Sequence, residues 1–214
     1  KKLAKRSWHE WITGNNQWKK AVQGYLASLA FADDMVGELL DALDNGPMAN
    51  DTIVVLWGDH GYHLGEKQHW EKFALWEDTT HVPLIILDPR RTRPGTRCKA
   101  PVSLLDIYPT LLEICALQPT PQTLEGRSLS ALMSAPGKET GHAVISTQGK
   151  GNHALRCARY RYIRYANGTE ELYDHRTDPN EWHNLAGEQG LTGVKQRLAA
   201  QLPAFNAEPI LIKR

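Results

Sequence analysis

Two short runs of consecutive apolar residues place the strongest constraint on the fold of this chain. Residues 52–57 and 82–87 are rich in Val, Ile and Leu and contain almost no polar residue. A strand with one solvated face alternates polar and apolar residues, whereas a strand covered on both faces reads as a continuous apolar run. The two runs therefore predict central strands of a parallel sheet that is covered by helices.

Helical patterns flank these two runs. Apolar residues recur at helical spacing over residues 20–43, and Asn45-Gly46-Pro47 follows, the order of residues expected just past a helix end. Residues 103–117 repeat the helical pattern. A helix, a buried strand, a polar loop and a second buried strand together predict an α/β sandwich, which we assign to residues 1–140.

The pattern changes after about residue 140. Four short segments, residues 143–147, 154–158, 160–165 and 170–173, predict antiparallel strands, and Asn167-Gly168 between the last two is a strong hairpin signal. Residues 191–202 predict a closing helix. We therefore expect residues 141–214 to form a small subdomain of antiparallel sheet plus helix.

Overall composition narrows the classes of function. The chain has 214 residues and a net charge of +1, which gives no field of the kind that attracts nucleic acid. No apolar run reaches the ~18–20 residues that a membrane span needs. An initiator Met and the apolar core of a signal peptide are both missing, so we expect the sequence to begin inside a longer chain.

The loop after the first strand carries the residues most suited to chemistry. Gly58-Asp59-His60-Gly61 stands at the carboxyl end of that strand, the edge at which open α/β sheets bind ligands. Asp59 offers oxygen ligands to a metal and His60 offers a nitrogen, and the glycines allow a close approach. Taken alone, an Asp-His pair is equally typical of a structural hydrogen bond in a loop, so both interpretations stay open.

The wider sequence around this loop resembles the second signature region of type I sulfatases. The resemblance rests on G-D-H-G-Y-H-L-G-E, then W-E-K, then T-H-V-P-L-I-I. It is closest to iduronate-2-sulfatase-like and bacterial polysaccharide sulfatases of the alkaline phosphatase superfamily. The segments F-A-D-D-M-V-G-E-L-L-D-A-L, S-L-L-D-I-Y-P-T-L-L-E-I and E-L-Y-D-H-R-T-D-P-N-E-W-H-N-L extend it over nearly the whole chain. The resemblance implies a partial alkaline-phosphatase-like α/β sandwich followed by the small C-terminal subdomain.

The resemblance also implies roles for particular residues. In that family one calcium ion is held by two acidic residues of the N-terminal half and by a pair that Asp59 and His60 match. Lys72 matches a lysine that contacts the sulfate ester, which makes it both substrate-binding and catalytic. A hard cation and an ammonium group suit this chemistry because they neutralise sulfate oxygens and the leaving oxygen. The competing interpretation of Lys72 is an ordinary exposed lysine.

Histidines near the loop are further candidates for substrate binding. His63 and His69 are predicted to donate hydrogen bonds to sulfate or to sugar hydroxyls, while a purely structural role is the alternative for each. For His153, at the start of a predicted strand, a turn and a contact with the glycan both stay open.

Other parts of the family's active site have no match in this sequence. The nucleophile is a formylglycine made within a C/S-x-P/A-x-R motif, and the stretches at Cys98, Cys115 and Cys157 all fail to match. The acidic pair Asp33-Asp34 lies within a predicted helix and is no substitute for the N-terminal metal ligands. We therefore expect the chain to be part of a sulfuric ester hydrolase for sulfated sugars or polysaccharides, completed by a missing N-terminal half and inactive alone.

Two alternatives stay open at this point. The chain could be a fragment of a phosphonate monoester or phosphodiester hydrolase of the same superfamily, or a non-catalytic partner subunit. The resemblance also favours an exported protein, whether periplasmic, extracellular or lysosomal.

Overall fold

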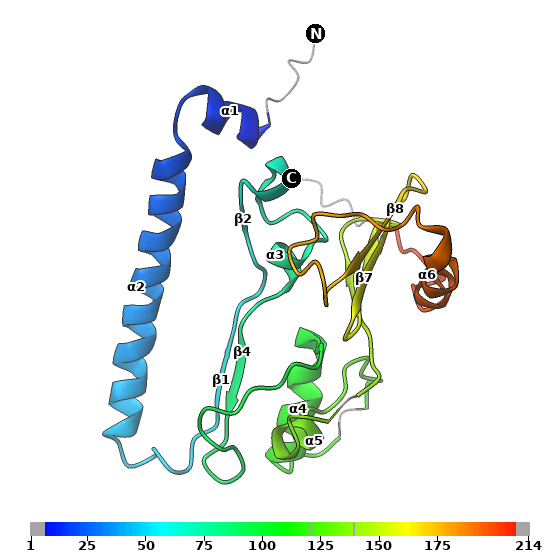
Figure 1. Cartoon of the computed structure of the whole chain (residues 1–214). Coiled ribbons are helices and arrows are strands. Elements are labelled where there is room, and N and C mark those ends of the chain that lie inside the picture. The colour runs from blue at the N-terminus through cyan, green and yellow to red at the C-terminus, as the bar shows by residue number, and fades with distance from the viewer. Residues whose placement is uncertain (1–6, 120, 139, 209–214) are drawn as a thin grey trace. The chain divides into compact units, whose positions relative to one another are not determined.

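The computed structural model describes residues 7–119, 121–138 and 140–208 (Figure 1). The chain separates into two compact units. The first unit ends at Lys72 and takes up again over His81–Arg90, and the second contains Phe73–Thr80 and everything from Arg91 onward. These units do not divide at residue 140, and the domain boundary expected there stays a prediction.

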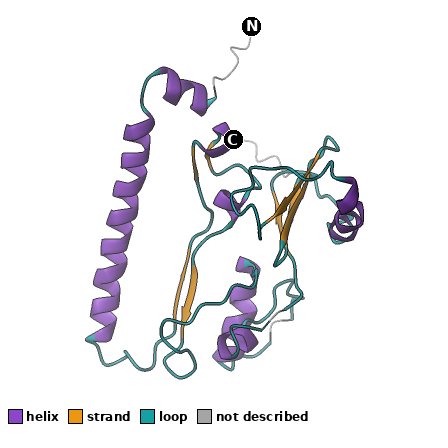
Figure 2. Ribbon diagram, viewed as in Figure 1, coloured by secondary structure: helices purple, strands orange, loops and turns teal. Residues whose placement is uncertain are grey.

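Two helices begin the first unit. Helix α1, Trp8–Gly14, starts with a capping box in which Ser7 and Glu10 satisfy each other's backbone N–H groups. Helix α2, Trp18–Asp44, confirms the helix predicted over residues 20–43 (Figure 2). None of its residues is buried, and Phe31 is 66% exposed.

Strands β1, Val54–Trp57, and β4, Leu84–Leu87, form the larger of two ribbons in the first unit. Both predicted strands exist, but the expected parallel sheet buried on both faces is wrong. Their pairing is antiparallel, with Val54 opposite Leu87, and Trp57 is 49% exposed. An apolar run reports the side-chain chemistry and not the strand direction, and the loop after β1 turns the chain back alongside it.

A small hairpin follows β1. Strands β2, His63–Leu64, and β3, Trp70–Glu71, are paired and are joined through the 3₁₀ turn η1, Glu66–Gln68. The hairpin contains His63 and His69, and Lys72 directly follows its second strand.

The helices of the second unit are short. Helix α3 spans Glu77–Thr80, and the helix predicted over residues 103–117 appears as the 3₁₀ turn η2, Leu104–Asp106, followed by α4, Ile107–Ile114. The hydroxyl of buried Thr110 joins α4 to the start of α5, Ser130–Ser134, because it accepts a hydrogen bond of 2.8 Å from the N–H of Leu129.

The C-terminal sheet confirms the predicted antiparallel strands. Its order is β5, β6, β7, β8, with the bounds Val144–Thr147, His153–Arg156, Tyr160–Arg164 and Glu170–Asp174. After the 3₁₀ turn η3, Gln189–Leu191, helix α6, Thr192–Ala199, packs its Leu198 on the sheet. In the predicted Asn167-Gly168 turn only Gly168 adopts a positive φ, of 85°.

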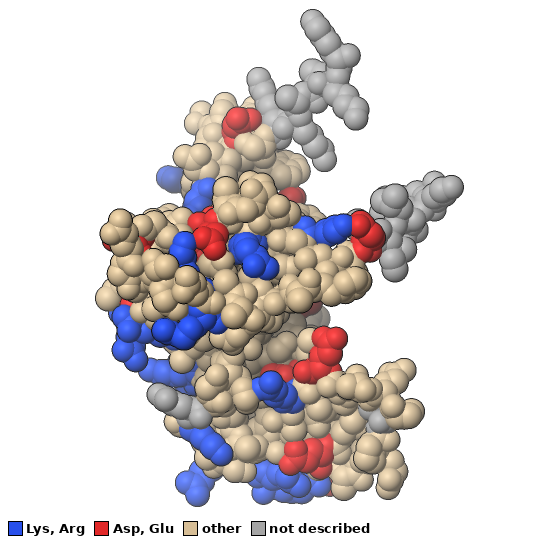
Figure 3. Space-filling view, turned by 90° about the vertical axis from the view of Figure 1, so that its right-hand side faces the viewer, with Lys and Arg blue, Asp and Glu red and all other residues tan. Residues whose placement is uncertain are grey.

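Charged groups are distributed without a dominant sign. On the face in Figure 3, Lys and Arg side chains and Asp and Glu side chains both lie scattered among uncharged residues. Among the described helices, none combines the length and apolar character that crossing a membrane requires.

Candidate functional site

A glycine at the end of β1 sets the position of Asp59 and His60. The N–H of Gly58 donates to the carbonyl of Pro83 at 3.0 Å, so the backbone stays paired with the returning chain for one residue beyond the strand. A Cβ atom at Gly58 would lie 3.4 Å from the Cβ of Val82. Asp59 and His60 therefore follow directly from the carboxyl end of β1, as predicted.

The side chains of Asp59, His60 and Lys72 meet, and we call them the Asp-His-Lys cluster. His60 Nε2 lies 3.6 Å from Asp59 Oδ2 and 2.9 Å from Lys72 Nζ. The other ring nitrogen of His60, Nδ1, lies 2.9 Å from the carbonyl oxygen of Gly61. Residues 12 positions apart in the sequence are thus brought together in one contact.

Hydrogen-bond chemistry defines the tautomer of His60. An ammonium group only donates and a carbonyl oxygen only accepts. The contacts therefore assign the proton of a neutral His60 to Nδ1, facing Gly61, and leave the lone pair on Nε2 facing Lys72. Nε2 and the Asp59 carboxylate are the two ligand atoms that the cluster can offer to a cation.

The two ligand atoms fit part of a divalent-metal site. A calcium ion takes six to eight ligands, nearly all oxygen, so Asp59 and His60 cover only a fraction of that shell. In addition, Lys72 Nζ lies on the Nε2 lone pair, so this hydrogen bond and metal binding at Nε2 exclude each other. The side chain of Asp59 is 83% exposed and that of His60 34%, which leaves the cluster accessible.

The backbone just before Lys72 is strained. Glu71 has a φ of 75°, in the left-handed region that costs a non-glycine residue roughly 1–2 kcal/mol. Trp70 beside it is only 5% exposed and anchors β3. Backbone strain of this kind is often found at functional sites, where it fixes the direction of a side chain. At Glu71 it turns the chain between buried Trp70 and exposed Lys72.

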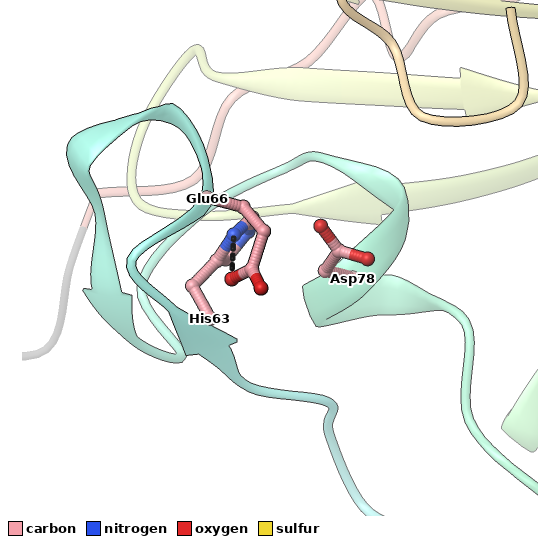
Figure 4. A group of neighbouring side chains, drawn as sticks. All are labelled: His63, Glu66 and Asp78. Carbon is pink, nitrogen blue, oxygen red and sulfur yellow. Dashed lines mark ion pairs between the residues drawn. The ribbon is translucent and has the colours of Figure 1, made fainter. Parts of the chain in front are cut away.

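His63 and His69 lie together inside the hairpin. The ring of His63 is fully buried and packs edge-to-face on His69, with 5.1 Å between ring centroids. His63 Nδ1 lies 3.9 Å from Glu66 Oε2 (Figure 4). The Glu66 carboxylate also accepts a hydrogen bond of 2.6 Å from the N–H of Leu64. Burial lowers the pKa of His69 and outweighs the opposing charge of Glu71. Contact of either histidine with substrate stays a prediction.

A buried ionic cluster in the second unit was not predicted. Its members are Glu77, Arg156, Arg161, His175 and Glu181. Arg161 is 2% exposed and Glu181 1%, and Arg161 Nε donates to Glu181 Oε1 at 2.5 Å. Arg161 Nη1 donates to the carbonyl of Leu75 at 3.1 Å. The residue types alone indicate solvent exposure, and their partners are far apart in sequence, so the pattern held no signal for this cluster.

Ion pairing, and not metal binding, explains this buried ionic cluster. The side chains of Glu77, His175 and Glu181 approach closely enough to hold a metal. However, Arg156 Nε lies 3.2 Å from Glu77 and Arg161 pairs with both glutamates, so two guanidinium groups already balance the carboxylates. Burial alone would raise the pKa of Glu77, but the positive charges of Arg161 and Arg156 lower it below its usual value.

Comparisons with known proteins identify the family. The sulfatase family model matches residues 5–116, and the model for the C-terminal region of N-sulphoglucosamine sulphohydrolase matches residues 65–208. The chain therefore belongs to the type I sulfatase family of hydrolases, within the alkaline phosphatase superfamily, as its sequence motifs had indicated.

Individual relatives agree with this assignment. A sulfatase of Formosa agariphila is 46% identical over 92% of this chain and 39% of its own length. Arylsulfatase K of Xenopus laevis is 33% identical over 77% of this chain and 33% of its own length. The chain thus spans well under half the length of these relatives.

Solved structures confirm the predicted fold class. The yidJ protein of Bacteroides fragilis is similar in fold, with a TM-score of 0.80 and 23% identity over 94% of this chain and 44% of that chain. A protein solved with its substrate D-glucosamine-2-N,6-O-disulfate has a TM-score of 0.69 and 25% identity, covering 82% and 38%. The phosphonate monoester hydrolase of Agrobacterium radiobacter has a TM-score of 0.67 and 25% identity, covering 80% and 38%.

Proposed function

We propose that this chain supplies part of the active site of a sulfuric ester hydrolase that removes sulfate from sulfated sugars. One observation carries the proposal: Lys72 contacts His60 beside Asp59 at the carboxyl end of β1. A cation and two metal-ligand groups are what an anionic sulfate ester requires at one point. The similarity to a protein solved with a disulfated glucosamine supports a sugar substrate.

In this proposal Lys72 acts on the leaving group. Its ammonium donates to a sulfate oxygen, and the bond strengthens as negative charge develops on the departing alcohol oxygen. His60 and Asp59 would hold one side of a calcium site. Substrate contact by His69, and by His63 with its fully buried ring, stays a prediction. Calcium, when bound, supplies positive charge against the sulfate oxygens. The remaining ligands and the formylglycine nucleophile are assigned to residues outside this chain, in an exported enzyme.

The hydrogen bond between Lys72 and His60 has a place in this scheme. His60 Nε2 lies 2.9 Å from Lys72 Nζ and is also the nitrogen that a divalent cation would use. His60 and Asp59 would hold that cation, which would supply positive charge to the sulfate oxygens, and Lys72 would donate to a sulfate oxygen beside it.

The chain alone is expected to bind calcium only weakly, because Asp59 and His60 supply two of six to eight ligands. Isothermal calorimetry with calcium chloride measures this directly. Tight binding by the 214-residue chain would contradict the assignment of the site.

Activity is tested in the complete protein with D-glucosamine-2-N,6-O-disulfate, following sulfate release. The Asp59→Asn variant is expected to lose most of its turnover because a metal carboxylate is gone. Asp51→Asn is the matched control, an exposed acid just before β1, and should retain activity. Equal activity of the two variants would remove Asp59 from the site.

Phosphonate monoester hydrolysis is the second candidate. The solved hydrolase from Agrobacterium radiobacter is about as similar to this chain in fold as the sugar-bound protein is. Parallel assays with the disulfated sugar and a phenyl phosphonate monoester separate the two functions. A sulfatase releases sulfate from the sugar faster, and a phosphonate monoester hydrolase releases phenol from the monoester faster. If the intact protein hydrolyses neither compound, the result favours the third hypothesis, a non-catalytic partner subunit.

A further inference from the structure

A recess in the first unit is lined by several aromatic side chains. This aromatic cleft has a volume of about 590 Å³ and lies between α1, the start of α2 and the β2–β3 hairpin. Its lining includes Trp8, Trp11, Lys20, Tyr25, Tyr62 and Glu71. We propose that the aromatic cleft binds a sugar ring of the substrate, beside the Asp-His-Lys cluster. This inference rests on the proposed sugar sulfatase function.

The walls of the cleft are exposed indole rings. Trp8 and Trp11 lie one turn apart on α1, with ring centroids 6.0 Å apart and planes at 85°. Trp8 is 54% exposed and Trp11 44%. Trp8 and Trp11 both line the cleft and give it flat apolar surface.

Two tyrosines line another side of the cleft. The rings of Tyr25 and Tyr62 lie 5.2 Å apart at a tilt of 31°. A phenol hydroxyl both donates and accepts hydrogen bonds, so the two tyrosines add polar groups to an aromatic wall.

Charged groups complete the lining. Lys20 comes from α2 and Glu71 from β3, so the cleft offers both a donor and an acceptor. A pyranose ring has a face of C–H groups and a rim of hydroxyl groups, and it matches an aromatic wall with a few polar side chains. The volume falls within the range of sites for small molecules, roughly 300–1,000 Å³.

Chain connectivity links the cleft to the Asp-His-Lys cluster. Tyr62 is two residues after His60, and Glu71 directly precedes Lys72. Both lining residues belong to the segment that carries the cluster, within the same compact unit. A sulfate group held at Lys72 therefore has an aromatic surface available for the sugar that bears it.

Ligand-observed saturation-transfer NMR on the 214-residue chain tests the proposal without requiring turnover. The probe is D-glucosamine-2-N,6-O-disulfate. The wild-type chain is expected to transfer saturation to the C–H protons of the ring. Trp11→Ala should weaken binding about 10-fold, the effect of losing one aromatic contact. Trp182→Ala, a 55% exposed tryptophan of the second unit, should leave binding unchanged.

A second substitution guards against misfolding of the tryptophan variant. Lys20→Met keeps the length of an exposed helical side chain and should weaken binding a few-fold while the circular dichroism spectrum stays the same. Absence of ring signals with the wild-type chain, or equal binding by wild type, Trp11→Ala and Lys20→Met, overturns the proposal.

The complete protein separates this inference from the proposed function. If the cleft holds the ring in the substrate and the transition state alike, Trp11→Ala should raise KM for the disulfated sugar and leave kcat nearly unchanged. If Trp11→Ala releases sulfate with the KM of the wild type, the sugar-binding role of the cleft is wrong and the sulfatase function stands. Ring binding that depends on Trp11, without any sulfate release, contradicts the sulfatase function alone.

Discussion

The C-terminal sheet and helix α2 are held in opposite ways. In the sheet, Leu155, Tyr162 and Leu172 are completely buried beneath α6. Along the 27 residues of α2 no side chain is buried, and Leu39 is 71% exposed. Within this 214-residue chain the sheet is stabilised by its own core, whereas α2 relies on its backbone hydrogen bonds and on its contacts with α1 and the hairpin.

The charged side chains of the two units also differ in burial. Arg161 and Glu181 form an ion pair that is removed from water, while Asp59 and Lys72 stand where solvent and ligands reach them. A buried ion pair holds neighbouring segments in place, whereas accessible charged groups can contact a ligand. From this difference we expect most of the chain's stability to come from the second unit, and we propose that the accessible groups of the first unit carry the chemistry.

The largest expected effect comes from breaking the buried ion pair. Arg161→Met leaves Glu77 and Glu181 without their shared guanidinium, and removing one partner of a buried pair costs about 3–5 kcal/mol. Urea denaturation followed by circular dichroism measures the loss. Arg159→Met, which breaks the half-exposed pair with Asp174, is the matched control and should cost far less. Equal losses would show that burial does not set the importance of these pairs.

Deleting core methyl groups should have the next largest effect. Leu172→Ala opens a cavity beneath the sheet and should lower the free energy of unfolding by roughly 2–5 kcal/mol. Leu29→Ala removes the same atoms from an α2 side chain that is 56% exposed, and should change it by no more than about 0.5 kcal/mol. A larger loss of unfolding free energy in Leu29→Ala than in Leu172→Ala would contradict this comparison.

Acid should weaken the second unit through Glu77. Its folded-state pKa is lowered below the ordinary 4.5, so its ionisation stabilises the fold above that pH and the contribution disappears as pH falls through the folded-state value. Urea midpoints between about pH 7 and pH 3 should therefore fall, and Glu77→Gln should reduce this dependence on pH. An unchanged slope in the variant would exclude Glu77 as the titrating group.

Sequence patterns predicted the helices and strands that a local pattern of apolar residues specifies. They missed the features that depend on residues distant in the sequence. Helix α2 and the four C-terminal strands follow from helical spacing and from short strands bounded by turns. Strand direction in β1 and β4 did not follow, because an apolar run is the same in either direction. The Arg161–Glu181 pair joins a strand to a loop 20 residues later, and neither residue type indicates burial.

For the candidate site, the sequence indicated the residues but not their contacts. Asp59, His60 and Lys72 were singled out from motifs, but the direct contact of Lys72 with His60 spans 12 residues and needs the hairpin to form. The aromatic cleft draws on α1, α2 and the hairpin together. Each tryptophan by itself is typical of packing, and only the folded arrangement brings the exposed rings to one surface.

The central claim is that Lys72 acts on the sulfate ester, and turnover of the disulfated sugar by Lys72→Ala in the complete protein tests it most directly. Loss of a charge-assisted bond that strengthens in the transition state should lower kcat roughly 10²–10³-fold, and more than it raises KM. Lys67→Ala is the control, since Lys67 lies in the same hairpin but outside the matched motif, and should be nearly as active as wild type. Near-normal turnover by Lys72→Ala together with a crippled Lys67→Ala would contradict the placement of the catalytic lysine.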